Sequence, residues 1–229
     1  MSSIYEIMMN LPLFKGVSRE KISELIEKNR FHFLKYASDE QIVATGDVCN
    51  HIRFIISGDA RIELSNFNHK LMLSEVISAP NVIGADYLFG MNTRYPFDVY
   101  ASGGSCGILQ IEKADYINIL YSDKVFLFNI LNSLSRNCQK YTEGLLSLSS
   151  GSVAERLSFL ILSLTQRGGK DICMKFKQKD LCTLLSVQRN SLVNALNDLN
   201  SRGIIEFTTS EIKVNSRELL QEFRNSSDY

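Results

Sequence analysis

The stretch "SVQRNSLVNALNDLNSRGII", residues 186–205, decides how the rest of this sequence is interpreted. Four of its apolar residues recur at i, i+3, i+4 and i+7, which predicts a helix over 189–201 with one buried face. These residues are Leu192, Ala195, Leu196 and Leu199. The opposite face of the same helix is polar, and its composition raises the question of what it contacts.

That polar face is rich in amides. Exposed helix positions are ordinarily filled by strong helix formers such as Glu and Lys, whereas Asn is a poorer helix residue and recurs here. In the major groove of DNA, Asn can form two hydrogen bonds to adenine and Arg two to guanine. The composition therefore favours base reading over an ordinary solvated surface. The candidate residues are Gln188, Arg189, Asn190, Ser191, Asn194 and Asn197.

The surrounding residues predict a small domain around this helix. We expect a helix over 153–167, a strand over 172–176, a helix over 178–185 and a hairpin over 203–215. Two helices joined by a short turn and followed by a hairpin are the layout of a winged helix-turn-helix. Its predicted core consists of Leu157, Leu160, Ile161, Leu181, Leu185, Leu192, Leu196 and Leu199.

Charge is balanced over the whole chain but not in this region. The 229 residues contain 25 Lys and Arg against 25 Asp and Glu, so a polyanion would have to be met by a local patch. Between 165 and 190, basic residues outnumber the acidic Asp171 and Asp180. We expect Lys177 and Lys179 to contact phosphates, with a solvated basic surface as the alternative.

Upstream, residues 31–112 predict a compact antiparallel β domain. Short segments rich in β-branched and aromatic residues are separated by turn residues at Gly46–Asp47, Gly58–Asp59 and Asn66. We expect the chain to reverse at both glycines. A helix capped by Ser18 precedes the domain.

Between 115 and 149 the apolar period becomes helical. The pattern predicts one long helix, or two in line with a break near Ser122–Asp123, followed by a hinge at "SSGS", residues 149–152. Alternating spacings of four and three residues form a heptad seam. The seam consists of Leu127, Leu131, Leu134, Cys138, Tyr141, Leu145 and Leu148. Its strict period favours a partner helix in a homodimer, and packing on the chain's own β domain is the alternative.

Taken in order, these pieces resemble the CRP/FNR (catabolite activator) superfamily of bacterial transcription regulators. The resemblance is carried by "ASDEQIVATGDVCNHIRFIISGDARIEL", residues 37–64, and "KQKDLCTLLSVQRNSLVNALNDLNSRGII", residues 177–205, and covers nearly the whole chain. It implies an α+β fold: a jelly-roll-like β-roll of the cyclic-nucleotide-binding type (a double-stranded β-helix) over 1–114, a dimerisation helix over 115–149 and a winged helix-turn-helix DNA-binding domain over 150–229.

The resemblance also implies a cytoplasmic homodimer that binds an inverted-repeat DNA operator, with RNA polymerase and a small-molecule effector as further partners. By position, the family's base-contacting arginine falls on Arg189, its usual glutamate partner on Asn190 and its second arginine on Asn194. Asn190 and Asn194 differ from the family's residues and imply a different half-site, richer in A·T.

The effector cassette departs further from the family. Where members that bind cyclic nucleotides have Gly-Glu and Arg-Ser pairs, this chain has Gly84–Ala85 and Tyr95–Pro96. Pro96 offers neither a hydroxyl nor an N–H to a phosphate, and a one-residue slip in a strand would turn Arg94 to the opposite face. We therefore expect an effector other than cyclic AMP. Aromatic residues including Tyr87 fit either a planar ligand or the core of the roll.

Other functions have weaker support in the sequence. The cysteines Cys49, Cys106, Cys138, Cys173 and Cys182 lack CxxC spacing, so we expect reduced, mostly buried thiols and no metal site. We identify no cofactor, no nucleotide-binding fingerprint, no nucleophile and base, no signal peptide and no apolar run long enough for a membrane span, so an enzyme ranks last. A module whose winged helix docks on a protein instead of DNA is the alternative function.

Overall fold

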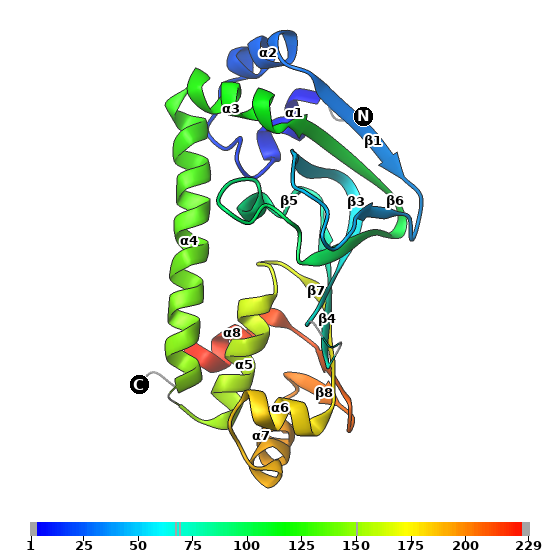
Figure 1. Cartoon of the computed structure of the whole chain (residues 1–229), viewed down its shortest axis with the longest axis vertical. Helices are drawn as coiled ribbons and strands as arrows, with labels where there is room; N and C mark the ends of the chain where they lie inside the picture. Colours follow the sequence, from blue (N-terminus) through cyan, green and yellow to red (C-terminus); the bar gives the residue numbers. More distant parts are fainter. Residues whose placement is uncertain (1–3, 67, 69, 150, 226–229) are drawn as a thin grey trace. The chain divides into compact units, whose positions relative to one another are not determined.

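The structure is a computed structural model that describes residues 4–66, 68, 70–149 and 151–225 (Figure 1). The chain forms two compact units, one from Met1–Arg61 and Ser78–Asn137, the other from Ile62–Ile77 and Cys138–Tyr229. The second unit therefore contains a segment from the middle of the β half. Within the described ranges, no helix has the length and apolar character needed to cross a membrane.

The first unit contains the predicted β-roll. Strand β1 (Phe31–Tyr36) pairs with β6 (Phe97–Glu112), antiparallel from Phe31 opposite Ile111 to Tyr36 opposite Cys106. Two further antiparallel pairings join β2 (Gln41–Val43) to β6 and β5 (Asn81–Ile83) to β3 (His51–Ser65). This unit also contains α1 (Ile4–Asn10), α2 (Arg19–Lys28), which Ser18 caps as predicted, and the short 3-10 helix η1 (Ala85–Tyr87).

One predicted reversal in the roll is wrong. The turn at Gly46 is confirmed, with the N–H of Asp47 donating to Ala44 O at 3.1 Å, but β3 runs without a break through Gly58. Gly58 has a φ of +75°, and a Cβ at this position would collide with the carbonyl oxygen of Ser105 on β6. Glycine is thus needed here for the close approach of two strands, not for a turn.

The predicted helical break is confirmed at Asp123. It separates α3 (Lys113–Ser122) from α4 (Lys124–Ser149), and its backbone is extended with a φ of −157°. The Asp123 carboxylate accepts the N–H of Val125 at 2.9 Å, which caps the new helix. Figure 1 shows a bend between α3 and α4, so the two helices are not in line. The hinge predicted at 149–152 includes Ser150, which lies outside the described residues.

The second unit has the predicted winged helix-turn-helix layout. Its helices are α5 (Val153–Leu164), α6 (Gln178–Leu184), α7 (Arg189–Ser201) and α8 (Arg217–Asn225), the last of which was not predicted. Its strands include β7 (Lys170–Phe176), β8 (Ile205–Phe207) and β9 (Glu211–Val214). The bounds predicted for the α7 helix are confirmed, and all eight predicted core leucines and isoleucine are buried.

Strand β4 (Leu71–Ser78) completes the sheet of this unit, in the order β4–β7–β9–β8. The side chain of Glu75 on β4 is 3% exposed and accepts the N–H of Gln166 with both carboxylate oxygens, at 2.9 and 3.0 Å. Burial raises the pKa of Glu75 to about 7, although the Gln166 hydrogen bond and the charges of Arg217 and Lys140 act in the opposite direction. The interior of this unit thus holds a carboxyl group that titrates near neutrality.

Candidate nucleic-acid interface

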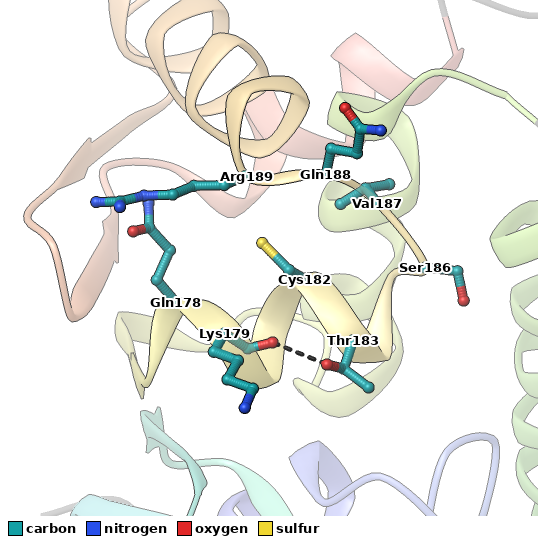
Figure 2. A pocket seen from close by; sticks show the side chains of 8 residues that line it. All are labelled: Gln178, Lys179, Cys182, Thr183, Ser186, Val187, Gln188 and Arg189. Carbon is teal, nitrogen blue, oxygen red and sulfur yellow. Dashed lines mark hydrogen bonds between the residues drawn. The ribbon is translucent and has the colours of Figure 1, made fainter.

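A cavity of about 720 Å³ lies between α6 and the start of α7 (Figure 2). Figure 2 shows α6 and the turn that leads into α7 on two sides of it. Its lining consists of Gln178, Lys179, Cys182, Thr183, Ser186, Val187, Gln188 and Arg189. Polar and cationic side chains therefore converge at the turn of the helix-turn-helix.

The turn is held by local hydrogen bonds and by one long side chain. Ser186 has a φ of +54°, and the N–H of Val187 donates to Cys182 O at 2.9 Å, which reverses the chain between the helices. Arg156 on α5 donates from Nη1 to Leu185 O at 3.0 Å and so satisfies a carbonyl at the end of α6. These contacts fix where Arg189 begins the second helix.

The two faces of α7 differ as the sequence predicts. The residues that face the core are Leu192, Ala195, Leu196 and Leu199, all buried. The predicted readers Arg189, Asn190, Ser191, Asn194 and Asn197 are all exposed. Of the predicted set, only Lys179, Gln188 and Arg189 line the cavity, while Lys177 lines a second cavity beside it. The asparagines lie farther along α7, outside the lining.

Sequence reasoning missed five of the lining residues, namely Gln178, Cys182, Thr183, Ser186 and Val187. A signal for some of them was present. The pairs 178/182 and 179/183 are four residues apart and so share a face of α6 that excludes the buried Leu181 and Leu185. Thr183 donates its hydroxyl proton to Lys179 O at 2.9 Å, which leaves the hydroxyl oxygen as an acceptor (Figure 2).

The candidate effector residues do not all come together. Tyr95 is 1% exposed, and its ring packs against Phe97 and Tyr87 with centroid distances of 5.7 and 6.3 Å. Its hydroxyl receives hydrogen bonds from Cys49 Sγ at 2.8 Å and Arg53 Nη1 at 3.1 Å. Burial raises the pKa of Tyr95, so the phenol is neutral. Tyr95 is therefore a core residue of the roll.

The neighbours of Tyr95 divide between the interior and the surface. Ala85 is buried and Tyr87 half-buried, and a Cβ added to Gly84 would lie 2.6 Å from the Tyr95 ring. Arg94 and Pro96 are exposed, and Arg94 donates from Nη1 to Gly46 O at 2.7 Å. The Arg94 guanidinium thus lies at the surface, in the segment before β6, where Arg94 forms an isolated antiparallel bridge with Val48.

The heptad seam on α4 is largely exposed in the single chain. The exposed fractions of Leu127, Leu131 and Leu145 are 41%, 47% and 72%, Tyr141 and Cys138 are also exposed, and Leu134 is half-buried. The side chain of Leu148 lies outside the described part of the structure. A different face of α4, with Phe126 and Ile130, is buried. The seam therefore does not serve as the main packing face within the chain.

The cysteines differ from expectation. Cys49 and Cys106 are buried, Cys173 and Cys182 are half-buried and Cys138 is exposed, so the prediction of mostly buried thiols is wrong. Cys138 lies on the exposed seam of α4, and Cys182 packs against the core of the second unit while it stays partly exposed. Among the described side chains, no group of three or more His, Cys, Asp or Glu is arranged to hold a metal ion.

Comparison with known proteins places the C-terminal part in a family. Residues 155–223 match the Crp-like helix-turn-helix domain. No curated protein sequence matches the chain. Among solved structures, the catabolite activator protein of Thermus thermophilus is 18% identical with a TM-score of 0.55, over 94% of this chain and 99% of its own. A transcriptional regulator from Thermotoga maritima is 21% identical with a TM-score of 0.50, over 57% and 98%.

The structural similarity confirms the predicted fold, a cyclic-nucleotide-binding-like β-roll with a C-terminal helix-turn-helix, and the family match shows that the helix-turn-helix is Crp-like.

Proposed function

We propose that this chain is a homodimeric, sequence-specific DNA-binding transcription regulator. The premise is that it has the fold of the CRP/FNR superfamily and carries a Crp-like helix-turn-helix domain at residues 155–223. The observation that carries the proposal is the exposed polar face of α7, which begins at the cavity it shares with α6. This face has the residue types that read base edges.

Each side chain has a role in this proposal. Arg189, at the first position of α7, reads guanine through its two-pronged guanidinium, and Asn190 and Asn194 read adenine through their amides. Lys177 and Lys179 contact phosphates and set the position of the domain on the duplex. Gln188, Ser191 and Asn197 add contacts at the edge of the major groove of DNA.

Dimerisation through the α4 seam follows from its exposed leucines. Exposed apolar residues at heptad spacing are stabilised when a second copy of the helix covers them. A dimer with a two-fold axis presents two copies of α7 and predicts an inverted repeat with half-sites about 10 base pairs apart. RNA polymerase would then bind the dimer while the dimer is bound to its operator.

The effector in this proposal is a small molecule other than cyclic AMP. A cyclic phosphate requires a cation and hydrogen-bond donors inside the roll. Tyr95 and Pro96 stand where the family has its Arg-Ser pair, and Tyr95 is itself buried there, while Arg94 is exposed. Direct titration of the full chain with cyclic AMP should therefore give no binding at millimolar nucleotide.

The main test is selection of the purified protein against a random duplex pool at moderate salt. We expect an enriched inverted repeat in the sequenced product. Arg189→Ala should reduce binding to that repeat by about tenfold or more, which corresponds to the 1–3 kcal/mol of a bidentate base contact, and should leave non-specific binding nearly unchanged. Equal losses on both kinds of DNA would exclude base reading, and binding that is insensitive to salt would favour docking on a protein.

A further inference from the structure

A second cavity, of about 340 Å³, lies in the second unit between the start of β4 and the hairpin of β8 and β9, which is the wing. Its polar lining consists of Lys70, Lys175, Lys177, Thr208, Ser210 and Glu211. Three ammonium groups and two hydroxyls thus surround one carboxylate. We name this set the lysine groove.

Strand pairing brings these residues together from three parts of the sequence. On β7, Lys175 lies opposite Met72 of β4 on one side and opposite Glu211 of β9 on the other. The wing is attached at the same place, because the N–H of Phe176 donates to Ser210 O at 2.9 Å. Lys70 immediately precedes β4, and its N–H donates to Asn66 Oδ1 at 2.8 Å. The groove is therefore built on the backbone of the sheet.

The carboxylates near the groove do not cancel its positive charge. Glu211 lies 3.8 Å from Lys213 Nζ and accepts a hydrogen bond from Cys173 Sγ at 3.1 Å. Lys70 is 3.6 Å from Asp180 on α6, and both side chains are partly exposed. Such a surface pair is worth little and breaks easily when a stronger anion is offered. Lysine and hydroxyl groups together are typical of contacts to phosphate oxygens, which carry no sequence information.

The lysine groove and the cavity between α6 and α7 are lined by consecutive residues. Lys177 lines the groove, and the next two residues, Gln178 and Lys179, line the cavity beside Arg189. A duplex read by α7 would therefore place its neighbouring phosphates near Lys177 and the wing. Lys70 and Lys175 extend the same positive surface beyond Lys177, and Lys70 comes from the segment Ile62–Ile77, outside the helix-turn-helix domain at 155–223.

We propose that the lysine groove binds the DNA backbone beside the half-site, and that Lys70 makes the β half of the chain a direct contributor to DNA affinity. This inference rests on the proposed function, since it concerns the same duplex. The partner is the sugar-phosphate backbone, because the groove offers point charges and hydroxyls and lacks the arginine or amide side chains that read bases.

The test compares the salt dependence of binding for full-length variants. Each phosphate contact contributes about 0.9 to the slope of log K against log salt. Because the proposed dimer carries two copies of each lysine, Lys70→Gln and Lys175→Gln should each lower the magnitude of the slope by about 1.8 and the affinity near 0.15 M salt by about thirtyfold. The loss should be the same on the enriched repeat and on random duplex. The double variant should lose about twice as much slope.

Two further variants test whether the effect is specific to the lysine groove. Lys35→Gln removes an exposed lysine from β1 in the first unit and should leave the slope unchanged. Asp180→Asn removes the carboxylate that pairs with Lys70 at 3.6 Å and should raise affinity on both kinds of DNA. Hydroxyl-radical footprints should lose protection beside the half-site in Lys70→Gln, with protection of the half-site retained.

Failure of this inference is distinguishable from failure of the proposed function. If the wild-type chain selects a repeat and Arg189→Ala abolishes its preference, while Lys70→Gln and Lys175→Gln behave like Lys35→Gln, the lysine groove does not bind DNA and the proposed function stands. If the wild-type chain binds no duplex at any salt concentration, both are overturned.

Discussion

Arg53 donates a hydrogen bond from its guanidinium to the hydroxyl oxygen of Tyr95, at 3.1 Å, inside the β-roll. The same guanidinium donates from Nε to Gln110 Oε1 at 2.9 Å. Two of the donors on this cation are therefore used by neutral partners within the chain. Under the proposed function, this phenol stands at the position where the family resemblance places the cation for a cyclic phosphate.

Removing the Tyr95 hydroxyl should destabilise the chain. Tyr95→Phe keeps the ring but removes the acceptor of Arg53 Nη1 and leaves the Cys49 thiol only the longer contact to His51 O at 3.5 Å, which should lower the free energy of unfolding by about 1–3 kcal/mol. Urea unfolding followed by circular dichroism measures the change, since the chain contains no Trp. Tyr87→Phe, in the same aromatic cluster, is the control and should cost less. Equal losses would show that the hydroxyl contacts of Tyr95 contribute little.

The buried Glu75 carboxyl should make stability depend on pH. Burial raises its pKa in the folded chain to about 7 from the ordinary 4.5, so the folded state binds the proton more tightly than the unfolded state. Its stabilising contribution is complete below about pH 4.5 and is lost as the pH rises through about 7. Glu75→Gln should therefore gain stability relative to wild type as the pH is raised from 5 to 8, by about 1–3 kcal/mol.

Unfolding midpoints of both proteins across this pH range give the measurement. Glu206→Gln, at an exposed position on β8, controls for the change of side-chain type. A difference between Glu75→Gln and wild type that is constant with pH would mean that Glu75 does not titrate in this range. In that case the pH at which DNA selection is carried out would not change the stability of the chain through Glu75.

Replacing Gly144 on α4 by alanine should have two opposing effects on stability. Replacing a helical glycine by alanine ordinarily gains about 1 kcal/mol of stability. Here the added Cβ would collide with the ring of Phe159, which is buried on α5, and overpacking of this kind costs about 1–3 kcal/mol. Gly144→Ala should therefore be destabilising by about 1 kcal/mol, and Phe159→Leu in the same chain should recover part of the loss. A stabilised single variant would show that the Phe159 ring moves aside at little cost.

A charge in the α4 seam should separate the dimer. Leu131 is 47% exposed in the single chain, so Leu131→Glu should leave the monomer folded while it places a carboxylate in the seam between two copies. Sedimentation velocity should shift from dimer to monomer at micromolar protein. Gln139→Glu adds the same charge to the same helix outside the seam and should remain dimeric. Dimers that persist in Leu131→Glu would place the contact between copies elsewhere.

Local periodicity accounts for the parts of the fold that the sequence predicts well. Helix α7 was located to the residue because Leu192, Leu196 and Leu199 define one face and Gly203 follows. Helix α8 was missed although it carried a similar signal: Leu220 is buried, and Ser216 Oγ accepts the N–H of Leu219 at 3.2 Å. That signal could have been found from the sequence alone.

Other features depend on residues far apart in the chain and leave no local pattern. Gly58 has the sequence context of a turn, and only the carbonyl of Ser105 on the adjacent strand shows why glycine is needed in mid-strand. The pairing of Leu71 with Phe176 joins residues more than a hundred positions apart. For the same reason the sequence predicts phosphate contacts at Lys177 and Lys179 but does not indicate that Lys70 lines the same groove as Lys177.

Strand β4 has a consequence for any attempt to isolate the DNA-reading half. A fragment that begins at residue 138 would lack β4, so one side of β7 would present unpaired backbone N–H and C=O groups, and Gln166 would lose the Glu75 carboxylate. An uncovered strand edge of this kind promotes aggregation. The helix-turn-helix of this chain therefore cannot be transplanted as one continuous segment, because the sheet that supports it is assembled from two separate parts of the sequence.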